Sequence, residues 1–591
     1  MPFDGLVTVA VCHQLKDSLI GARIEKIYQP LKEELALLLS KPGERYRLLI
    51  SANAKNARVH TTENSKPNPS NPPLFCMVLR KHLDGGVISE INQPGLERLL
   101  QFKVNTRDEL GRPTVKTLVV EIMGKHSNII LVDQNNRILD GIKRYSHAVS
   151  RHREVLPGRD YMPPPEQGKI NPIGLNEERF MELVTSADID MKLTDILLKT
   201  FDGFSPRMCR EVVFRSGLPL ETSLNHCGQY ELSLIWQHFY DICSNLDHSQ
   251  FNPSLVLNRD GTPNDFAAFS LSQFKDLVVE HGDICQILDK FYTRKEQLEK
   301  LQAKKQSLLT IVSSEINRLK KKIPKFKKSL HQADQADDYR LFGELLTANM
   351  HLLEKGLKKV QLENYYHPNY NKVNIELNPQ KTPSENVQAY FKKYNKAKKT
   401  TVAVKEQLSQ AEEELSYLEG VDTAVRHASS IIDLEETKTE LVSQGYLKPK
   451  SFDKTKKKDK KRSKPQPMEY QSMDGFTILV GKNNRQNDYL TQRIAQATDI
   501  WLHTKEIPGS HVVIRTEGGD VPPTTLEQAA VLAAYHSKAR QSSSVPVDYT
   551  FVKHVHKPNG AKPGMVIYEN QQTITINPDE EKVHNMSRTK E

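Results

Sequence analysis

The sequence predicts a multidomain α+β protein, and three patterns along its 591 residues support this fold class. Strand-like runs mix with single helices near both ends of the chain. Two long stretches with heptad-spaced apolar residues occupy the centre. A lysine-rich segment separates this centre from the C-terminal part. A chain of this length divides into several domains, each able to bury its own core.

Residues 1–170 are predicted to form a mixed α/β domain. Helices are expected near residues 8–19 and 73–83, which end before Gly21 and Gly85. Apolar runs between turn signals predict strands at 23–28, 35–39, 47–52, 99–104, 117–122 and 128–132. The presence of both element types is the basis of the α/β assignment.

Residues 171–285 are predicted to be mostly helical, with a sharp turn near Gly203. A helix is expected to end there, Ser205 can cap the next helix, and Pro206 suits its first turn. This arrangement resembles a helix-hairpin-helix, in which a glycine turn and a helix N-terminus present N–H groups to a phosphate. Gly203, Ser205 and Arg207 are therefore candidate RNA-binding residues. An ordinary helical hairpin is the alternative.

Residues 286–440 are predicted to form a long antiparallel coiled coil around a small tip module at about 364–384. Apolar residues recur at heptad spacing on both arms, at Leu301, Leu308, Val312, Leu319, Phe326 and Leu330, and at Val404, Leu408, Ala411, Leu415 and Leu418. Pro324 is expected to kink the first arm. Each arm of about 60 residues would extend roughly 90 Å.

The positive charge of the chain concentrates on this central part. The whole chain carries +10, whereas residues 291–400 hold 23 Lys and Arg against 11 Asp and Glu, a surplus of 12. Two clusters contribute most, namely Lys320, Lys321, Lys322, Lys325, Lys327 and Lys328, then Lys392, Lys393, Lys396, Lys398 and Lys399. A basic rod favours contact with a phosphate backbone, and nucleic acid suits it better than a membrane. A merely solvated lysine face is the alternative.

The C-terminal part begins with a predicted basic linker at 441–467, because ten of the seventeen residues from 448 to 464 are Lys or Arg. Residues 468–578 are predicted to form a mixed α/β domain with two helices and with strands at 476–480, 511–515, 547–555, 564–568 and 573–576. The polar tail at 579–591 is expected to be loose.

The segment 499–511 combines one of the two Trp residues with two His and a Pro-Gly-Ser turn. Polar neighbours and a sharp turn around Trp501 favour a shallow surface for stacking and hydrogen bonding. Trp501, His503, Ser510 and His511 are therefore candidate RNA-binding residues. The alternative is a core Trp beside an ordinary β-turn.

Several other functional classes lack their sequence signatures. The six Cys residues form no Cys-x-x-Cys pair and the histidines lack ligand spacing, so neither zinc nor a disulfide framework is expected. No GxxxxGK[ST] loop occurs, so no nucleotide cofactor is expected. The N-terminus lacks a signal-peptide pattern and no run of 18 apolar residues occurs, which predicts a cytoplasmic protein without a membrane partner.

From end to end, the chain resembles the NFACT family, and its lack of a zinc knuckle favours the bacterial members. The motifs that carry the resemblance are Phe3-Asp4-Gly5, Pro72-Pro-Leu-Phe-Cys-Met-Val-Leu-Arg-Lys81, Glu121-Ile-Met-Gly-Lys-His-Ser-Asn128, Gly203–Arg207, Asp499–His511 and Lys562-Pro-Gly-Met-Val-Ile567. The resemblance implies an NFACT-N domain similar to formamidopyrimidine glycosylases, a helix-hairpin-helix domain, a coiled coil with a middle module, and an RNA-binding NFACT-R domain, in that order.

This resemblance implies that the protein binds obstructed large (50S) ribosomal subunits that still carry peptidyl-tRNA. Members of the family recruit alanyl-tRNA there and direct mRNA-independent C-terminal alanine tailing, which marks the stalled nascent chain for degradation. Implied partners are 23S rRNA, ribosomal proteins near the stalk base, alanine tRNA and a small S4-like RNA-binding cofactor. Because the ribosome forms the peptide bond, the resemblance implies a ribosome-associated recruiter and not an enzyme.

The resemblance also assigns tRNA binding to particular residues of the N-terminal domain, which are Asp4, Glu97, Arg98, Glu121, Ile122 and Met123. The family has an Asp-Arg pair where this chain has Glu97 and Arg98, so the carboxylate lies about one methylene farther out. The alternative for these two residues is an exposed ion pair at the start of a strand.

Two other functions compete with this interpretation. A DNA glycosylase of the formamidopyrimidine type uses an N-terminal proline amine as nucleophile and has Glu directly after it, whereas Phe3 separates Pro2 from Asp4 in this chain. A fibronectin-binding surface adhesin is the second alternative, because some family members carry that name. An adhesin would leave the basic rod unexplained.

Overall fold

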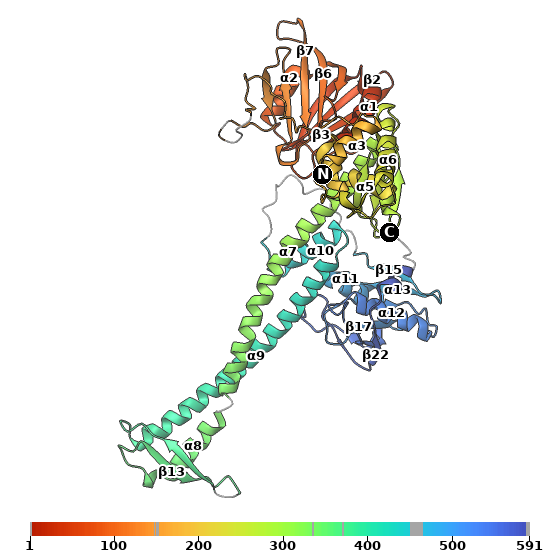
Figure 1. The fold of residues 1–591 in the computed structure, drawn as a ribbon. Coiled ribbons are helices and arrows are strands. Elements are labelled where there is room, and N and C mark those ends of the chain that lie inside the picture. Colours follow the sequence, from red (N-terminus) through yellow and green to blue (C-terminus); the bar gives the residue numbers. More distant parts are fainter. Residues whose placement is uncertain are drawn as a thin grey trace. The chain divides into compact units, whose positions relative to one another are not determined.

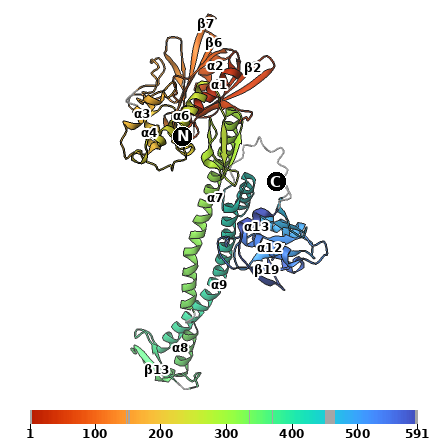
Figure 2. The same ribbon diagram turned by 45° about the vertical axis from the view of Figure 1, so that its right-hand side comes forward.

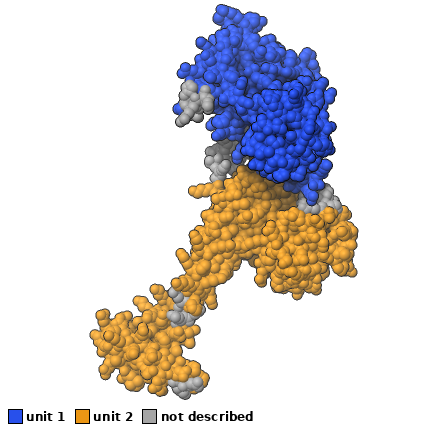
Figure 3. All heavy atoms as spheres, viewed as in Figure 1, with its two compact units in different colours: residues 1–298 blue, residues 299–591 orange. Residues whose placement is uncertain are grey.

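The computed structural model describes residues 3–146, 148, 153–333, 336–368, 371–448 and 465–586. The chain divides into two compact units, Met1–Leu298 and Glu299–Glu591, which Figure 3 distinguishes by colour. Most of the predicted basic linker, residues 449–464, lies outside the described residues. No helix within the described ranges is both long enough and apolar enough to span a lipid bilayer.

The first unit is built on a nine-stranded sheet with the order β4-β3-β2-β1-β5-β6-β7-β8-β9. Its strands are β1 (Arg23–Leu31), β2 (Glu34–Lys41), β3 (Glu44–Ser51), β4 (Arg58–Thr61), β5 (Val87–Asn92), β6 (Leu99–Arg107), β7 (Pro113–Glu121), β8 (Asn128–Val132) and β9 (Ile138–Gly141). Every pairing is antiparallel, so the sheet is a meander and not a parallel α/β sheet. The six predicted strands are confirmed, whereas β4, β5 and β9 were not predicted.

Two helices pack against this sheet (Figure 1), and both were predicted from the sequence. They are α1 (Gly5–Leu19) and α2 (Leu74–Leu83). Strands β6 to β8 are buried on both faces, because alternate residues enter two separate cores. Phe102 and Leu118 join the core beneath α1, whereas Val119 joins the core on the opposite face. The start of β6 and the end of β7 are therefore held rigidly.

The rest of the first unit contains α3 (Glu177–Thr185), α4 (Leu193–Thr200), α5 (Pro206–Arg215) and α6 (Gln229–Asp247). The helical prediction for residues 171–285 is wrong in one respect, because a three-stranded sheet follows α6. Its strands are β10 (Ser254–Leu257), β11 (Pro263–Ala267) and β12 (Val278–His281), in the order β11-β10-β12. These strands are short, and their apolar residues share the large core of the unit, so no helical or strand periodicity distinguishes them.

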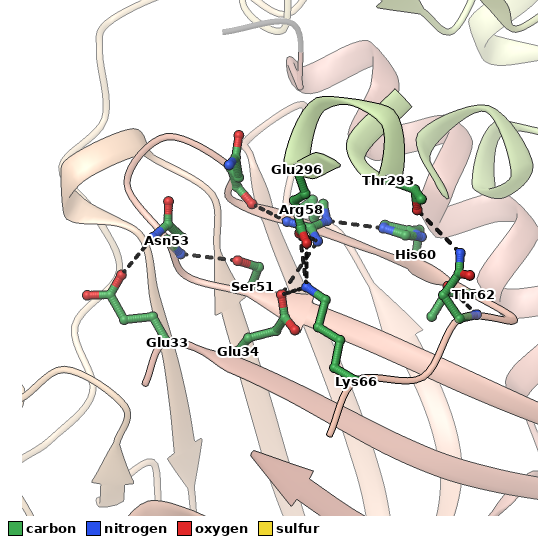
Figure 4. Close-up of polar contacts among 12 residues, drawn as sticks. Glu33, Glu34, Ser51, Asn53, Arg58, His60, Thr62, Lys66, Thr293 and Glu296 are labelled. Carbon is green, nitrogen blue, oxygen red and sulfur yellow. Dashed lines mark hydrogen bonds and ion pairs between the residues drawn. The ribbon is translucent and has the colours of Figure 1, made fainter. Parts of the chain in front are cut away.

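Helix α7 (Ile284–Ala333) begins in the first unit, where a polar network anchors it to the sheet (Figure 4). The Arg58 guanidinium lies 2.6 Å from the Glu296 carboxylate and 4.6 Å from the ring centre of Tyr292. Lys66 lies 2.9 Å from Glu296 and 2.8 Å from Glu34. Because Arg58 and Glu34 are almost fully buried, solvent does not weaken these ion pairs as it would at the surface.

The second unit contains a pair of long helices, α7 and α9 (Pro383–His427), which lie side by side in Figures 1 and 2. Their facing apolar residues form one buried cluster, which includes Leu308, Val312, Leu319, Ala411 and Leu418 from the predicted seam. Lys320 pairs with Glu419 and Lys327 with Glu412, so the residue numbers run in opposite directions along the two helices. Pro324 lies inside α7, which continues for several residues beyond it. The short α10 (Ile431–Ser443) follows α9.

A small module joins the far ends of α7 and α9, and it begins at α8, well before the predicted segment of 364–384. It consists of α8 (Ala336–Ala348), the hairpin of β13 (Lys359–Glu363) and β14 (Lys372–Glu376), and the first turns of α9. Leu345, Leu346 and Ile375 are the buried centre of its own apolar cluster. Thr382 caps α9 through a reciprocal capping box with Glu385, which fixes where the helix begins.

The C-terminal domain is a six-stranded antiparallel sheet with the order β15-β16-β18-β17-β19-β22. Its strands are β15 (Met468–Gln471), β16 (Thr477–Val480), β17 (Ile500–Thr504), β18 (Val512–Ile514), β19 (Val545–Phe551) and β22 (Gln572–Ile576), with a separate pair β20 (Val555–His556) and β21 (Ile567–Tyr568). Three helices accompany them, α11 (Asn484–Tyr489), α12 (Pro523–Tyr535) and α13 (Glu580–Asn585). The loose tail predicted from 579 is wrong up to 586, because α13 buries Val583 and Met586 in the domain core.

Candidate tRNA-binding and RNA-binding sites

Five of the residues predicted to bind tRNA or RNA line one cavity of about 170 Å³ in the first unit. These residues are Asp4, Glu97, Arg98, Gly203 and Ser205. They come from the start of α1, the start of β6 and the turn between α4 and α5. The structure therefore joins two predicted sites, the N-terminal acid with its Glu-Arg pair and the glycine turn, into one.

Two glycines make this convergence possible. The Gly5 N–H donates a hydrogen bond to the Gly203 carbonyl at 3.0 Å, which joins the start of α1 to the α4–α5 turn. A Cβ atom at Gly5 would lie 2.2 Å from the Leu96 carbonyl oxygen and 2.4 Å from the Gly203 Cα, so no side chain fits there. Gly203 has φ +80°, a left-handed conformation that favours glycine.

Asp4 is buried and serves as the N-cap of α1, where its Oδ1 accepts a hydrogen bond from the Val7 N–H at 2.9 Å. Burial raises the pKa of Asp4 to about 6, although a hydrogen bond from the Ser205 side chain, the Val7 N–H and the nearby Arg98 each act to lower it. The carboxyl group can therefore exchange a proton close to neutral pH. Ser205 in turn caps α5, since its side chain accepts from the Met208 N–H.

Glu97 and Arg98 both line the cavity and are residues of opposite charge. Burial and the neighbouring Asp202 raise the pKa of Glu97, while Arg98 lowers it. Within the described ranges, no carboxylate lies at ion-pair distance from the Arg98 guanidinium. Lys169 and Asp202 also line the cavity and were missed by the sequence analysis. Asp202 could have been found, because it directly precedes the glycine of the predicted turn, whereas nothing in the sequence distinguishes Lys169.

The segment of Glu121, Ile122 and Met123 does not line this cavity, so its predicted direct contact with tRNA is wrong for Glu121. The Glu121 carboxylate is fully buried and accepts hydrogen bonds from Arg153 at 2.7 Å and from the Tyr161 hydroxyl at 3.0 Å. Buried charges need such partners, and a ligand cannot reach a carboxylate that is fully buried among them.

Ile122 supports the cavity through its backbone. Its N–H donates to the Arg98 carbonyl at 2.8 Å and so fixes the backbone at the start of β6, while its side chain is fully buried. Met123 is half-buried, and its N–H donates to the Ser127 hydroxyl at 2.8 Å. The segment therefore positions Arg98.

Arg207, the third predicted residue of the α4–α5 turn, makes side-chain contacts within the first unit. Its guanidinium pairs with the buried Asp265 and lies 5.1 Å from the ring centre of Phe274. One third of its side chain is exposed. Arg207 therefore retains a surface for a phosphate contact, but the Asp265 carboxylate competes for the same charge.

Trp501 does not form the predicted stacking surface. It is completely buried in the central strand β17, with its ring 4.9 Å from Tyr568 and 5.7 Å from His503, measured between ring centres. Pairing of β17 with β18 and β19 on its two sides places the residue in the middle of the sheet. The core alternative for this Trp is correct.

The histidines near Trp501 belong to the same interior. His511 is almost fully buried, and its Nδ1 lies 2.8 Å from the Thr491 hydroxyl. Burial lowers its pKa well below the usual value, and burial lowers the pKa of the half-buried His503 to about 4. Both rings are neutral at pH 7 and do not attract phosphate. Ser510 differs, because it lines a separate cavity of about 250 Å³.

The lysine clusters of α7 and α9 remain largely exposed. The sequence suggested little compensating acid, but Glu419 and Glu412 of α9 neutralise Lys320 and Lys327 of α7. Lys393 lies 5.0 Å from the ring centre of Tyr390. The other nine lysines of the two clusters stay exposed and form no ion pair with any described residue; they are Lys321, Lys322, Lys325, Lys328, Lys392, Lys393, Lys396, Lys398 and Lys399. Their charge is available to an anionic partner.

No metal site adds to these features. Among the described residues, no group of three or more His, Cys, Asp or Glu side chains is arranged to hold a metal ion.

Comparison with known proteins gives full-length relatives. The chain is 41% identical over 595 aligned residues to the Rqc2 homolog RqcH of Bacillus subtilis (strain 168), and the alignment covers 100% of both chains. It is 24% identical to the human ribosome quality control complex subunit NEMF over 60% of this chain and 33% of that protein. The solved C-terminal structure of the fibronectin/fibrinogen-binding protein from Streptococcus suis is 35% identical, covers 48% of this chain and 98% of that chain, and has a TM-score of 0.39.

Two domain families together account for nearly the whole chain. Residues 4–462 match the NFACT N-terminal and middle domains, and residues 466–570 match the NFACT protein RNA binding domain. The first match alone covers more than half of the 591 residues. The chain therefore belongs to the NFACT family.

Proposed function

We propose that this protein acts in ribosome quality control. In this proposal it binds obstructed 50S subunits that carry peptidyl-tRNA, recruits alanyl-tRNA, and directs mRNA-independent alanine tailing of the stalled nascent chain, which marks the chain for degradation. The names of its relatives, Rqc2 homolog RqcH and ribosome quality control complex subunit NEMF, support the pathway. Sequence identity over the full length of the bacterial relative supports the same role for this chain.

The observation that carries the proposal is the cavity at which Asp4, Glu97, Arg98, Gly203 and Ser205 converge. Arg98 forms no ion pair with any described residue, and its guanidinium presents several N–H donors in one plane, which suits a phosphate or the acceptor edge of a base. The two carboxylates accept hydrogen bonds from amino and hydroxyl groups of RNA. At about 170 Å³ the cavity is too small for a whole nucleotide, so we expect it to hold one edge of a tRNA nucleotide.

The paired helices supply the contact with the subunit in this proposal. Helix α7 has 50 residues and so extends about 75 Å at 1.5 Å per residue, and it carries unpaired lysines on its surface. We expect these lysines to contact 23S rRNA, with ribosomal proteins near the stalk base and a small S4-like RNA-binding protein as further partners. The protein is a cytoplasmic, ribosome-associated recruiter, and the ribosome forms each peptide bond.

The Arg98→Ala variant tests whether the cavity binds tRNA independently of the contact between the paired helices and the subunit. Full-length protein is affinity-purified from cells, sedimented on a sucrose gradient, and its bound RNA is sequenced. We expect co-sedimentation with 50S subunits to persist and alanine tRNA to be lost, because the variant removes a guanidinium that lines the cavity and forms no ion pair with any described residue. Arg112→Ala, at an exposed position outside the cavity, is the matched control and should retain both. Equal loss of 50S subunits and tRNA in Arg98→Ala would contradict the proposal.

A further inference from the structure

The cavity of about 250 Å³ in the second unit has no role in the function proposed above. It lies between the C-terminal end of α9 and the C-terminal domain. One wall comes from Gly420 and Ala424 of α9 and from Ala428 directly after it, and the domain contributes apolar surface from Met468 and Tyr535. The small residues of α9 keep the space open, since a longer side chain at any of them would enter it.

Three polar groups that face this cavity have unused hydrogen-bonding capacity among the described residues. Ser510 is 8% exposed, and its hydroxyl forms no hydrogen bond there. The His427 ring also forms none, although it lies 6.5 Å from the His536 ring, measured between centres. Asn484 donates its amide N–H to Glu440 at 3.1 Å, which leaves its carbonyl oxygen open. Ser510 and Asn484 are buried and His427 is half-buried, so these three groups can form hydrogen bonds with the polar edge of a ligand that enters the cavity.

The charges around the cavity are already balanced. Lys482 lies 3.3 Å from Asp433, and Arg540 lies 2.8 Å from Glu580. Burial, together with the nearby cations Arg540 and Lys305, lowers the pKa of His427 to about 4, so this ring is neutral at pH 7. A free phosphate or carboxylate would need an unpaired cation inside the cavity. The occupant that fits is therefore uncharged.

A wider and more open groove adjoins the cavity and shares His427, Tyr535 and Arg540 with it. Its further lining includes Arg426 and Lys538, whose side chains are more than half exposed. Exposed ion pairs are weak and exchange readily, so these cations can turn from Asp422 and Glu419 to an incoming phosphate. A cavity whose lining cations are paired with carboxylates thus opens beside a groove in which Arg426 and Lys538 form only exposed, weak ion pairs.

We propose that the cavity takes one unstacked nucleobase of a single-stranded RNA, whose phosphates follow the adjoining groove. A nucleobase combines apolar faces with a polar edge, which matches apolar walls and the open groups of Ser510, His427 and Asn484. A base-paired duplex cannot deliver its bases into so narrow a space. The proposal rests on the RNA-binding part of the proposed function and is independent of tRNA recruitment by Arg98.

The Ala424→Leu variant of the full chain tests the proposal, because leucine would fill the cavity. Binding is measured by fluorescence anisotropy with labelled oligouridine and oligoadenine strands of about 12 nucleotides, and with a duplex of the same length. We expect affinity for the single strands to fall about tenfold and affinity for the duplex to stay unchanged. Ala403→Leu, at an exposed position on the same helix, is the matched control and should bind as the unchanged chain does. Unchanged single-strand binding by Ala424→Leu, or equal loss of single strand and duplex, would overturn the proposal.

Thermal unfolding beside Ala403→Leu would reveal whether leucine disturbs folding, and three further measurements keep the test decisive if it does. Ser510→Ala removes only a hydroxyl and should weaken single-strand binding several-fold. A strand that carries 4-thiouridine should crosslink to Met468, Tyr535 or His427, and crosslinks confined to other segments would overturn the assignment. Uridine monophosphate that competes as strongly as the strand would identify a free-nucleotide site and contradict RNA as the source. Because naked RNA is the probe, failure here leaves the Arg98→Ala result unaffected.

Discussion

The cavity of the first unit and the Trp501 neighbourhood of the C-terminal domain offer similar signals in sequence but opposite environments in the fold. Both combine glycine with polar and aromatic residues. In the first unit, Asp4 and Ser205 cap two helices and Arg98 precedes a strand, so the three side chains meet at a cavity. In the C-terminal domain, Trp501 lies within a strand that is paired on both sides, so it is completely buried.

The contrast between the two regions shows which positions in an element leave polar groups accessible to a ligand. The first turn of a helix leaves backbone N–H groups and capping side chains at the end of an element, where a ligand can reach them. A central strand uses its backbone groups on both neighbours and turns its side chains into the core. Position within the element therefore decides whether the same residue types bind a ligand or stabilise the fold.

The largest expected effect comes from Trp501. We expect Trp501→Ala to lower the free energy of unfolding of the C-terminal domain by about 3–5 kcal/mol, because it empties a fully buried site. Hydrogen exchange of β17 and α12 peptides in the full chain measures this change. Met473→Ala is the control, since Met473 is 87% exposed, and should change stability by less than about 0.5 kcal/mol. Lost RNA binding with unchanged protection would restore the surface interpretation of Trp501.

We expect a substitution of Glu121, like one of Trp501, to lower stability. Unlike Arg98→Ala, it should leave tRNA binding intact. Glu121→Gln removes the charge that compensates the buried Arg153, and we expect a loss of about 3 kcal/mol in the free energy of unfolding of the first unit. Hydrogen exchange of β7 peptides reports this loss, and tRNA should still co-purify at a temperature where the variant is folded. Glu109→Gln at the exposed pair with Lys81 is the control, and its stability should stay close to that of the unchanged chain. A Glu121→Gln protein of normal stability without tRNA would show direct contact instead.

Asp4 should make the stability of the first unit depend on pH. Its folded-state pKa of about 6 lies above the unfolded value of 3.8, so the ionised carboxylate costs stability as the pH rises through this window. Asp4→Asn keeps a capping side chain without the charge. We expect its free energy of unfolding, relative to the unchanged chain, to improve by about 2 kcal/mol between about pH 4 and pH 8. Denaturant titrations at both pH values measure the difference, and a pH-independent difference would contradict the burial of the charge.

The smallest expected effect concerns the turn that closes the cavity. Gly203→Ala should cost about 1 kcal/mol more in the free energy of unfolding than Gly217→Ala, although both residues have φ near the same positive value. A Cβ at Gly203 would lie 2.9 Å from the Leu96 Cβ, whereas nothing lies within 4 Å of a Cβ at Gly217. Equal costs, measured by denaturant unfolding, would mean that the turn adapts without strain.

The sequence alone determined the elements whose hydrogen bonds and spacing are local. Ser205 and Pro206 marked the start of α5 because a cap and its first turn involve residues three positions apart. The seam residues Leu308, Val312 and Leu418 followed from helical periodicity and are buried between α7 and α9.

The tertiary structure alone decided what depends on partners far away in sequence. The antiparallel order of the first sheet, the unpredicted strands β10 to β12 and the burial of Trp501 depend on which strands pair, and side-chain periodicity does not encode that choice. The same holds for Glu419, which neutralises Lys320 from the opposite helix. Asp4 and Ser205, about 200 residues apart, meet only because Gly5 and Gly203 let two backbones approach closely. Local chemistry thus fixed the helices and their caps, whereas long-range packing determined which charged residues line the cavity.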